Sequence, residues 1–273
     1  MTAQPESSGI FLASIALEPN RWRREPEKIP SLRVSEWSER AARSGFAGWE
    51  LWEHHYLKAG EKERKALAAS SLPVRIFNTY RIPGIDPHED WLRVAEAVRH
   101  LGDRMRAIKF NLGKADVPVE RQIEAALAWA ESLPEDVRML CECHPGTVLE
   151  DPSAAARAFN VWPADRFGAI LHPMNRDPGH CERWLEALGS RIGHLHWQAR
   201  NEENRICSLL DKRDQVARAV HLLAGKGFIG TQSIEFVEGT GRPGESPETL
   251  FAAAQRDLRT LLGLHSGEIC QSN

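Results

Sequence analysis

The sequence has no strong excess of charge of either sign, no long apolar run and no cysteine framework. Its net charge is −3, which argues against an extended nucleic-acid-binding surface. No apolar run reaches the roughly 20 residues that a membrane-spanning helix needs, and residues 1–9 lack the charged-then-apolar layout of a signal peptide. We therefore expect a cytoplasmic protein that binds neither nucleic acid nor membranes.

The five cysteines do not follow a disulfide or zinc-binding spacing. Only Cys141 and Cys143 lie close together, and no second pair is present to complete a zinc site. An odd number of cysteines fits a reducing compartment. We interpret Cys141 and Cys143 as two small side chains that face the surrounding helices.

Apolar, strand-like segments alternate eight times with helix-like segments. The predicted strands are 10–17, 49–52, 74–77, 107–110, 137–143, 167–171, 191–197 and 229–236. The predicted helices are 31–44, 60–70, 87–101, 119–132, 153–159, 181–188, 211–224 and 247–264. This alternation is typical of parallel βαβ units.

Eight such units in 273 residues predict an α/β fold, namely a (β/α)8 TIM barrel. The main alternative is an open doubly wound sheet, which usually has a glycine-rich phosphate-binding turn after its first strand. Here the first strand leads into Glu18-Pro19-Asn20 instead, which favours the barrel. Because no linker or change of composition marks a boundary, residues 1–273 are predicted to form a single domain, with flexible ends at 1–9 and 266–273.

Polar residues gather where the predicted strands end, which is where TIM barrels carry their active sites. These residues are Glu50, Asn78, Lys109, Glu142, His144, His172, His196 and Glu235. In the strand that ends near Glu142, alternation places Glu142 and His144 on one face. A buried carboxylate normally requires a partner or a metal ion, so this pattern predicts a metal site.

Four short motifs resemble those of the xylose isomerase-like TIM-barrel superfamily of sugar isomerases and epimerases, which also contains endonuclease IV. They are Gly45-Phe46-Ala47-Gly48-Trp49-Glu50-Leu51, Glu142-Cys143-His144-Pro145-Gly146, Arg191-Ile192-Gly193-His194-Leu195-His196 and the segment 227–235. In this order and spacing they indicate the superfamily but no particular activity.

The resemblance implies one divalent metal ion held by Glu142, a sixth-strand residue, His196 and Glu235. The family usually has Asp on the sixth strand and His three residues later, where this chain has His172 and Asn175. With His172 as a ligand, two imidazoles favour Mn, Zn, Co or Fe over Mg.

Several assignments around this set stay open. His172 could instead contact a metal ligand or the substrate, and Asp177 is a weaker substitute ligand because it lies farther into the loop. The change to Asn175 removes a group that could ionise beside the substrate. His194, one layer deeper than His196, is predicted to be a hydrogen-bonded core histidine.

The function that the resemblance implies is a metal-dependent sugar isomerase or epimerase. Glu142 and Glu235 would serve as base and acid on a sugar or keto-sugar, through a metal-stabilised enediolate. A lyase or dehydratase that uses the same site, or a non-catalytic sugar-binding barrel, are the alternatives. Endonuclease IV-like DNA repair is not expected, because it needs a trinuclear zinc site and a basic face. Dimers and tetramers are common among the proteins that the chain resembles.

Six further residues are candidates for substrate binding: Glu50, Trp52, Lys109, His144, Asn175 and Arg200. For Lys109, an internal ion pair with a neighbouring carboxylate is the alternative. Glu50 could close a salt bridge across the barrel mouth, and Arg200 could belong to a solvated loop.

Overall fold

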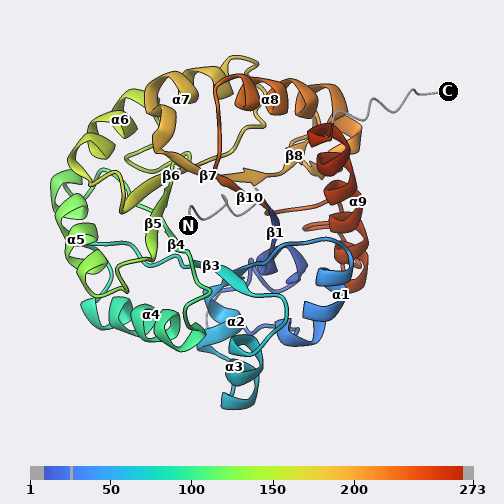
Figure 1. The fold of residues 1–273 in the computed structure, drawn as a ribbon, viewed down its shortest axis with the longest axis horizontal. Helices are drawn as coiled ribbons and strands as arrows, with labels where there is room; N and C mark the ends of the chain where they lie inside the picture. Colours follow the sequence, from blue (N-terminus) through green and yellow to red (C-terminus); the bar gives the residue numbers. More distant parts are fainter. Residues whose placement is uncertain (1–8, 25–26, 267–273) are drawn as a thin grey trace, which may run out of the picture.

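The computed structural model describes residues 9–24 and 27–266, and its central feature is a closed barrel of parallel strands (Figure 1). The barrel strands are β1 (Ile10–Ala13), β2 (Trp49–Trp52), β3 (Val74–Asn78), β4 (Ala107–Phe110), β5 (Arg138–Glu142), β6 (Phe167–Leu171), β7 (Ile192–Trp197) and β10 (Thr231–Ile234). They follow one another around the barrel in chain order, and β10 closes it by pairing with β1. The predicted (β/α)8 TIM barrel is therefore confirmed.

The helices form an outer ring around the strands (Figure 1). They are α1 (Ser38–Arg43), α2 (Glu53–Leu57), α3 (Glu61–Ala68), α4 (His88–Leu101), α5 (Val119–Glu131), α6 (Pro152–Val161), α7 (His180–Leu188), α8 (Arg213–Gly225) and α9 (Pro247–His265). None of the described helices is long and apolar enough to cross a membrane. A small antiparallel sheet of β8 (Ala199–Arg200) and β9 (Ile206–Cys207) lies between β7 and α8.

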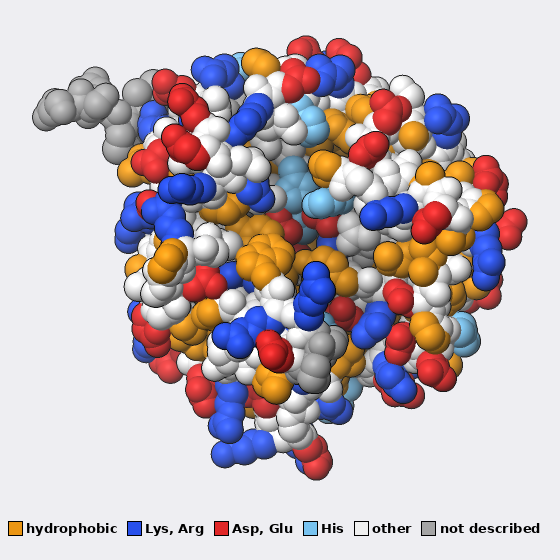
Figure 2. Space-filling model, turned by 180° about the vertical axis from the view of Figure 1, so that it is seen from behind, with side chains coloured by type: hydrophobic (Ala, Val, Ile, Leu, Met, Phe, Trp, Pro, Cys, Tyr) orange, Lys and Arg blue, Asp and Glu red, His pale blue; other side chains and the backbone are white. Residues whose placement is uncertain are grey.

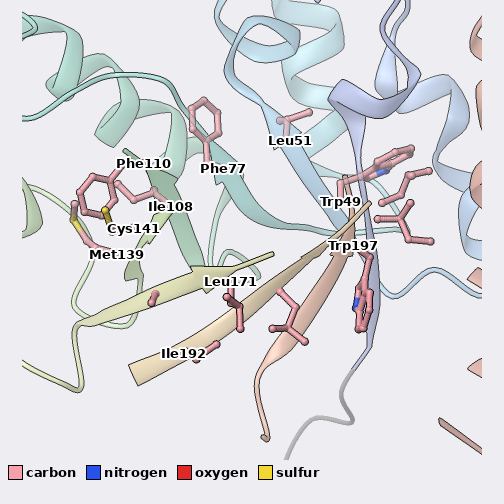
Figure 3. Packing of buried hydrophobic residues seen from close by; sticks show 14 of the residues in the cluster. Trp49, Leu51, Phe77, Ile108, Phe110, Met139, Cys141, Leu171, Ile192 and Trp197 are labelled. Atoms are coloured by element: carbon pink, nitrogen blue, oxygen red, sulfur yellow. The ribbon is translucent and has the colours of Figure 1, made fainter. Parts of the chain in front are cut away.

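Side-chain alternation along each strand separates two environments. In β5, Met139 and Cys141 belong to the large apolar cluster between the strands and the helices (Figure 3), whereas Leu140 and Glu142 alternate with them and point into the barrel. Cys143 is buried in the same outer cluster, so the prediction that both cysteines pack against the helices is confirmed.

The interior of the barrel is apolar at one level and polar at the next. The apolar level contains Phe11, Ile76, Ala107, Leu140 and Ile170. Two residues farther along β3, β4 and β5 lie Asn78, Lys109 and Glu142, all buried. This spacing of two places the polar side chains toward the C-terminal ends of the strands.

Several predicted boundaries were wrong. The first strand ends at Ala13 rather than Leu17, and Ser14–Leu17 forms a 3-10 helix. The Ser14 hydroxyl accepts a hydrogen bond from the Trp52 backbone and lies 2.9 Å from His55 Nδ1, so side-chain contacts replace strand pairing here. The predicted helix 31–44 is a 3-10 turn followed by the short α1.

Other differences concern short elements and the ends of the chain. Neither α2 nor the β8–β9 sheet was predicted. The eighth barrel strand is shorter than predicted, covering Thr231–Ile234. The predicted flexible ends fall largely on residues 1–8 and 267–273, which lie outside the described residues.

One buried carboxylate, Asp257 of α9, anchors the loop that precedes α8. Its Oδ1 accepts hydrogen bonds from the Ser208 hydroxyl and the Leu209 backbone, at 2.8 and 2.9 Å. Its Oδ2 is buried with no hydrogen-bond partner among the described residues. Burial therefore outweighs these hydrogen bonds and raises the pKa of Asp257 to about 6.

We predict that Asp257 makes the fold less stable as pH rises. The folded state binds the proton more tightly than the unfolded chain, so its stabilising effect is complete below pH 4 and is lost as pH rises through about 6. Urea unfolding at pH 5 and pH 7.5 should show that the wild type loses about 1–2 kcal/mol more than Asp257→Asn does. Equal pH dependence in both proteins would contradict the assignment.

Candidate functional site

Four side chains that follow or end β5, β6, β7 and β10 meet inside the barrel mouth. They are Glu142, His172, His196 and Glu235, and each offers a ligand atom within 4.8 Å of the others. His196 Nδ1 lies 3.4 Å from one carboxylate oxygen of Glu142 and 3.4 Å from one of Glu235. His172 Nε2 lies 2.7 Å from Glu142 Oε1. The structure thus brings together the four residues predicted as metal ligands.

The group has the donor atoms and spacing that a small divalent ion needs. Ligands at about 2.0–2.2 Å from a tetrahedral ion lie about 3.4 Å from one another, which is close to the separations around His196. His196 Nδ1 is buried and has no hydrogen-bond partner among the described residues. A buried nitrogen between two carboxylates and without a hydrogen bond fits a metal ligand.

Glu142 is held ionised by its neighbours. Lys109 Nζ lies 2.8 Å from Glu142 Oε2, and the Asn111 amide donates to the same oxygen over 2.9 Å. Burial opposes ionisation, but the charge of Lys109 and the neighbouring imidazoles of His172 and His196 outweigh it, so the pKa of Glu142 lies well below its usual range.

Lys109 itself is fully buried inside the barrel. It also donates to Asn111 Oδ1 over 2.8 Å, and its ammonium lies 4.2 Å from the centre of the Tyr80 ring. Of the two alternatives that the sequence left open, the structure shows the internal ion pair with Glu142.

Glu50 is also fully buried, beneath the four-residue group. It accepts a hydrogen bond from Asn78 over 2.6 Å, and its Oε2 lies 3.1 Å from His196 Nε2 and 3.3 Å from His194 Nε2. Burial opposes its ionisation, but the two histidines outweigh burial and hold the pKa of Glu50 well below its usual range. Glu50 therefore contacts protein groups on the far side of His196.

His194 is buried with both ring nitrogens engaged. Nδ1 lies 2.7 Å from Thr231 Oγ1, and Nε2 lies 2.9 Å from Ser233 Oγ. Glu50, His194 and His196 form a second group with metal-ligand spacing, in which Glu50 Oε2 lies between the two imidazoles. The prediction of a hydrogen-bonded core histidine is confirmed.

Two polar residues at this site were not predicted to have a role. Gln198 donates its amide hydrogens to His172 Nδ1 and Glu235 Oε2, at 3.1 and 3.0 Å, and Asn111 joins Lys109 to Glu142. Each lies two residues beyond an inward-facing residue, His196 or Lys109. Continuing the alternation past the predicted strand ends would have identified both.

A cavity of about 680 Å³ opens beside the four-residue group. His172 belongs to both, and Gln198, which contacts His172 and Glu235, also lines the cavity. Histidine and acidic side chains are visible in a hollow near the centre of the face drawn in Figure 2. Three of the residues predicted to bind substrate, His144, Asn175 and Arg200, line this cavity. His144 is exposed and is not part of the metal-ligand group, although its ring centre lies 6.5 Å from that of His172.

The other three predicted substrate contacts, Glu50, Trp52 and Lys109, are buried and do not line the cavity. Trp52 packs in an apolar cluster that includes Ile206 and Phe236. Asp177, the weaker substitute ligand, lies exposed in its loop and pairs with Arg183.

Comparison with solved structures shows which fold this is. The E. coli 3-keto-D-glucoside 4-epimerase YcjR matches with a TM-score of 0.61 and 13% identity, over 95% of this chain and 100% of that one. The probable 3-DHS dehydratase AsbF from Bacillus anthracis matches with a TM-score of 0.60 and 14% identity, over 93% and 98%.

A xylose isomerase-like TIM-barrel protein from Mycobacterium smegmatis, solved with magnesium, gives a TM-score of 0.58 and 12% identity, over 95% of this chain and 100% of that one. No protein-family model matches the chain, and no curated protein matches its sequence. The chain therefore shares its TIM-barrel fold with these three proteins.

We predict that Lys109 and Glu142 depend on each other for stability in metal-free protein. Lys109→Met leaves a buried carboxylate without its cation and should cost about 3–5 kcal/mol of unfolding free energy. Adding Glu142→Gln removes that charge, so the double variant should be less destabilised than the sum of the single variants.

This coupling is measurable by urea unfolding in the presence of a chelator. Lys114→Met, which changes an exposed lysine, serves as the control and should leave stability within about 0.5 kcal/mol of the wild type. Strictly additive costs for Lys109→Met and Glu142→Gln would show that the ion pair does not stabilise the barrel interior.

Proposed function

We propose that this protein is a metal-dependent sugar isomerase or epimerase, which acts by proton abstraction next to a carbonyl. The observation that carries the proposal is the arrangement of Glu142, His172, His196 and Glu235 around one point at the barrel mouth. The ion would be held by these four residues, and their two imidazoles favour Mn, Zn, Co or Fe over Mg. Once bound, it would supply Lewis acidity to the substrate's carbonyl oxygen.

The contact between Glu50 and His196 supports this assignment of ligands. A metal-binding imidazole usually donates its second N–H to a carboxylate, which fixes the tautomer and the orientation of the ring. Glu50 Oε2 lies 3.1 Å from His196 Nε2, while Nδ1 faces Glu142 and Glu235. Glu50 would therefore be a positioning residue that keeps the proton on Nε2 and leaves Nδ1 free.

The surroundings of the two carboxylates suggest different roles in the reaction. Glu142 is ion-paired with Lys109, which weakens it as a proton acceptor. Glu235 Oε2 accepts a hydrogen bond from the neutral Gln198 amide, and no lysine or arginine among the described residues pairs with Glu235. Glu235 is accordingly our candidate for the base that takes the proton, while Glu142 anchors the site.

The position to which the proton returns would decide the product. Glu235 would remove the proton from the carbon beside the carbonyl, and the electron pair would move toward the carbonyl oxygen. Return of a proton to the opposite face of that carbon gives epimerisation, and return to the neighbouring carbon gives isomerisation. The cavity of about 680 Å³ is within the size range of small-molecule sites.

We predict about one equivalent of divalent metal per chain in purified wild-type protein. Glu142→Gln and Glu235→Gln should each lose most of it, because each removes a charged ligand from a set of four. Elemental mass spectrometry measures the content and identifies the metal.

His144→Gln is the matched control for the metal measurement. His144 lines the same cavity but lies outside the ligand group, so this variant should retain the metal. Metal-free wild-type protein, even after reconstitution with Mn, Zn, Co or Fe, would contradict the proposed site and favour a non-catalytic sugar-binding barrel.

We predict that metal-loaded protein exchanges a substrate C–H proton with solvent. Incubation with a panel of neutral and charged keto-sugars in deuterated water should place deuterium on the carbon beside the carbonyl, detected by NMR. Chelation of the metal should stop the exchange. The same spectra distinguish an epimer, an isomer and a dehydrated product.

The exchange experiment has a clear negative outcome. Saturable binding of a keto-sugar to metal-loaded protein without any exchange would exclude isomerase, epimerase and dehydratase chemistry by this route. The protein would then be a binding barrel that retains the shape of the active site.

A further inference from the structure

We infer that the ligand of this site is an anion, a sugar acid or sugar phosphate, whose charged group is bound by Arg200 and Lys212. The inference rests on the proposed function for the reacting end of the ligand and adds how its other end is recognised. Both side chains line the cavity that opens beside the four-residue group.

The cavity wall carries an excess of positive charge. Its lining includes the cations Arg176, Arg200 and Lys212, against a single acidic side chain, Glu202. The cavity is also lined by three histidines, His144, His172 and His180. A concave surface with this charge attracts and retains anions.

The three cations differ in how many hydrogen bonds they already make to the protein. Arg176 donates through Nη2 to the backbone oxygens of Asn201 and Glu202, at 3.4 and 2.6 Å, so it ties two loops together. Arg200 donates through Nη1 alone, to the Asn204 backbone oxygen over 2.9 Å. Most of its guanidinium donors therefore remain available to a ligand.

Of the three cations, Lys212 makes the fewest interactions with the protein. Within the part of the chain that the structure describes, its ammonium makes no hydrogen bond or salt bridge. A partly buried lysine on the wall of a cavity, with no partner for its ammonium, is suited to meet an anionic ligand.

The position of Lys212 adds a second attraction for an anion. It is the residue at the N-cap of α8, a helix of 13 residues, and no side chain caps this end. Gln215, in the first turn of α8, also lines the cavity. The N-terminal end of α8 thus borders the cavity beside Lys212, and its helix dipole favours negative charge there.

The two ends of the site are electrostatically opposite. Glu142 and Glu235 are buried at the inner end, whereas Arg200 is exposed and Lys212 is only partly buried. In the metal-free protein, an anion placed next to Glu142 and Glu235 would be repelled by like charge, so the favourable position for it is beside Arg200 and Lys212. The reacting carbonyl would then point toward the inner end.

Calorimetric titration of metal-stripped wild-type protein with two matched pairs of probes tests the inference. The pairs are D-fructose 6-phosphate with D-fructose, and D-glucuronate with D-glucose. Removing the metal prevents the anions from binding through it. We expect at least one charged probe to bind about tenfold more tightly than its neutral parent, with an affinity that falls as salt rises.

The variants Arg200→Gln and Lys212→Gln identify the residues responsible. Each should weaken binding of the charged probe about three- to tenfold, and the double variant should lose the preference over the neutral parent. Arg205→Gln is the matched control, because Arg205 lies in the same loop but does not line the cavity, and it should leave the affinity unchanged.

Preference for the phosphate or for the carboxylate probe tells which anion the site recognises, and either supports the inference. Three results overturn it: equal affinity for charged and neutral probes, no saturable binding of either charged probe, or a preference that survives in the double variant.

A protein that keeps the anion preference but exchanges no substrate proton refutes the proposed function alone. Proton exchange on neutral keto-sugars without any anion preference refutes the anion subsite alone.

Discussion

The structure of the barrel mouth depends on one buried ion pair, between Lys109 and Glu142. Lys109 and Glu142 are opposite charges inside the barrel, 2.8 Å apart. Each would be costly to bury without the other. Their pairing engages Glu142 Oε2 and leaves Oε1 directed toward His172 and His196, so one interaction both permits the polar layer and orients a carboxylate into the mouth.

The polar layer contacts two further sets of side chains in the site. Below it, Glu50 pairs with His196 and His194, and Asn78 holds Glu50 in place. Beside it, Gln198 links His172 to Glu235 and marks the start of the cavity. A buried carboxylate on one side of His196 and two on the other leave Nδ1 as the atom without a hydrogen bond, which is where the proposed metal would bind.

The cavity extends the site beyond the group that carries the chemistry. Its inner end adjoins the four-residue group through His172, and its wall carries the cations Arg176, Arg200 of β8 and Lys212 at the start of α8. This separation of charge would orient an anionic sugar derivative so that its carbonyl reaches the ligand group. The fold supplies that orientation because successive strand ends lie side by side around the mouth.

The barrel was predictable from the sequence pattern, and the four-residue group from the resemblance of the strand-end motifs to a known superfamily. Regular alternation of strands and helices indicates the fold, and the inward residues at strand ends, such as Glu142 and His196, follow from a period of two. The three-dimensional structure was needed to show that Lys109 and Glu50 are buried partners of other side chains and that Lys212 borders the cavity. Such contacts join strands and loops far apart in the chain, and periodicity within one strand carries no information about which distant side chain lies opposite.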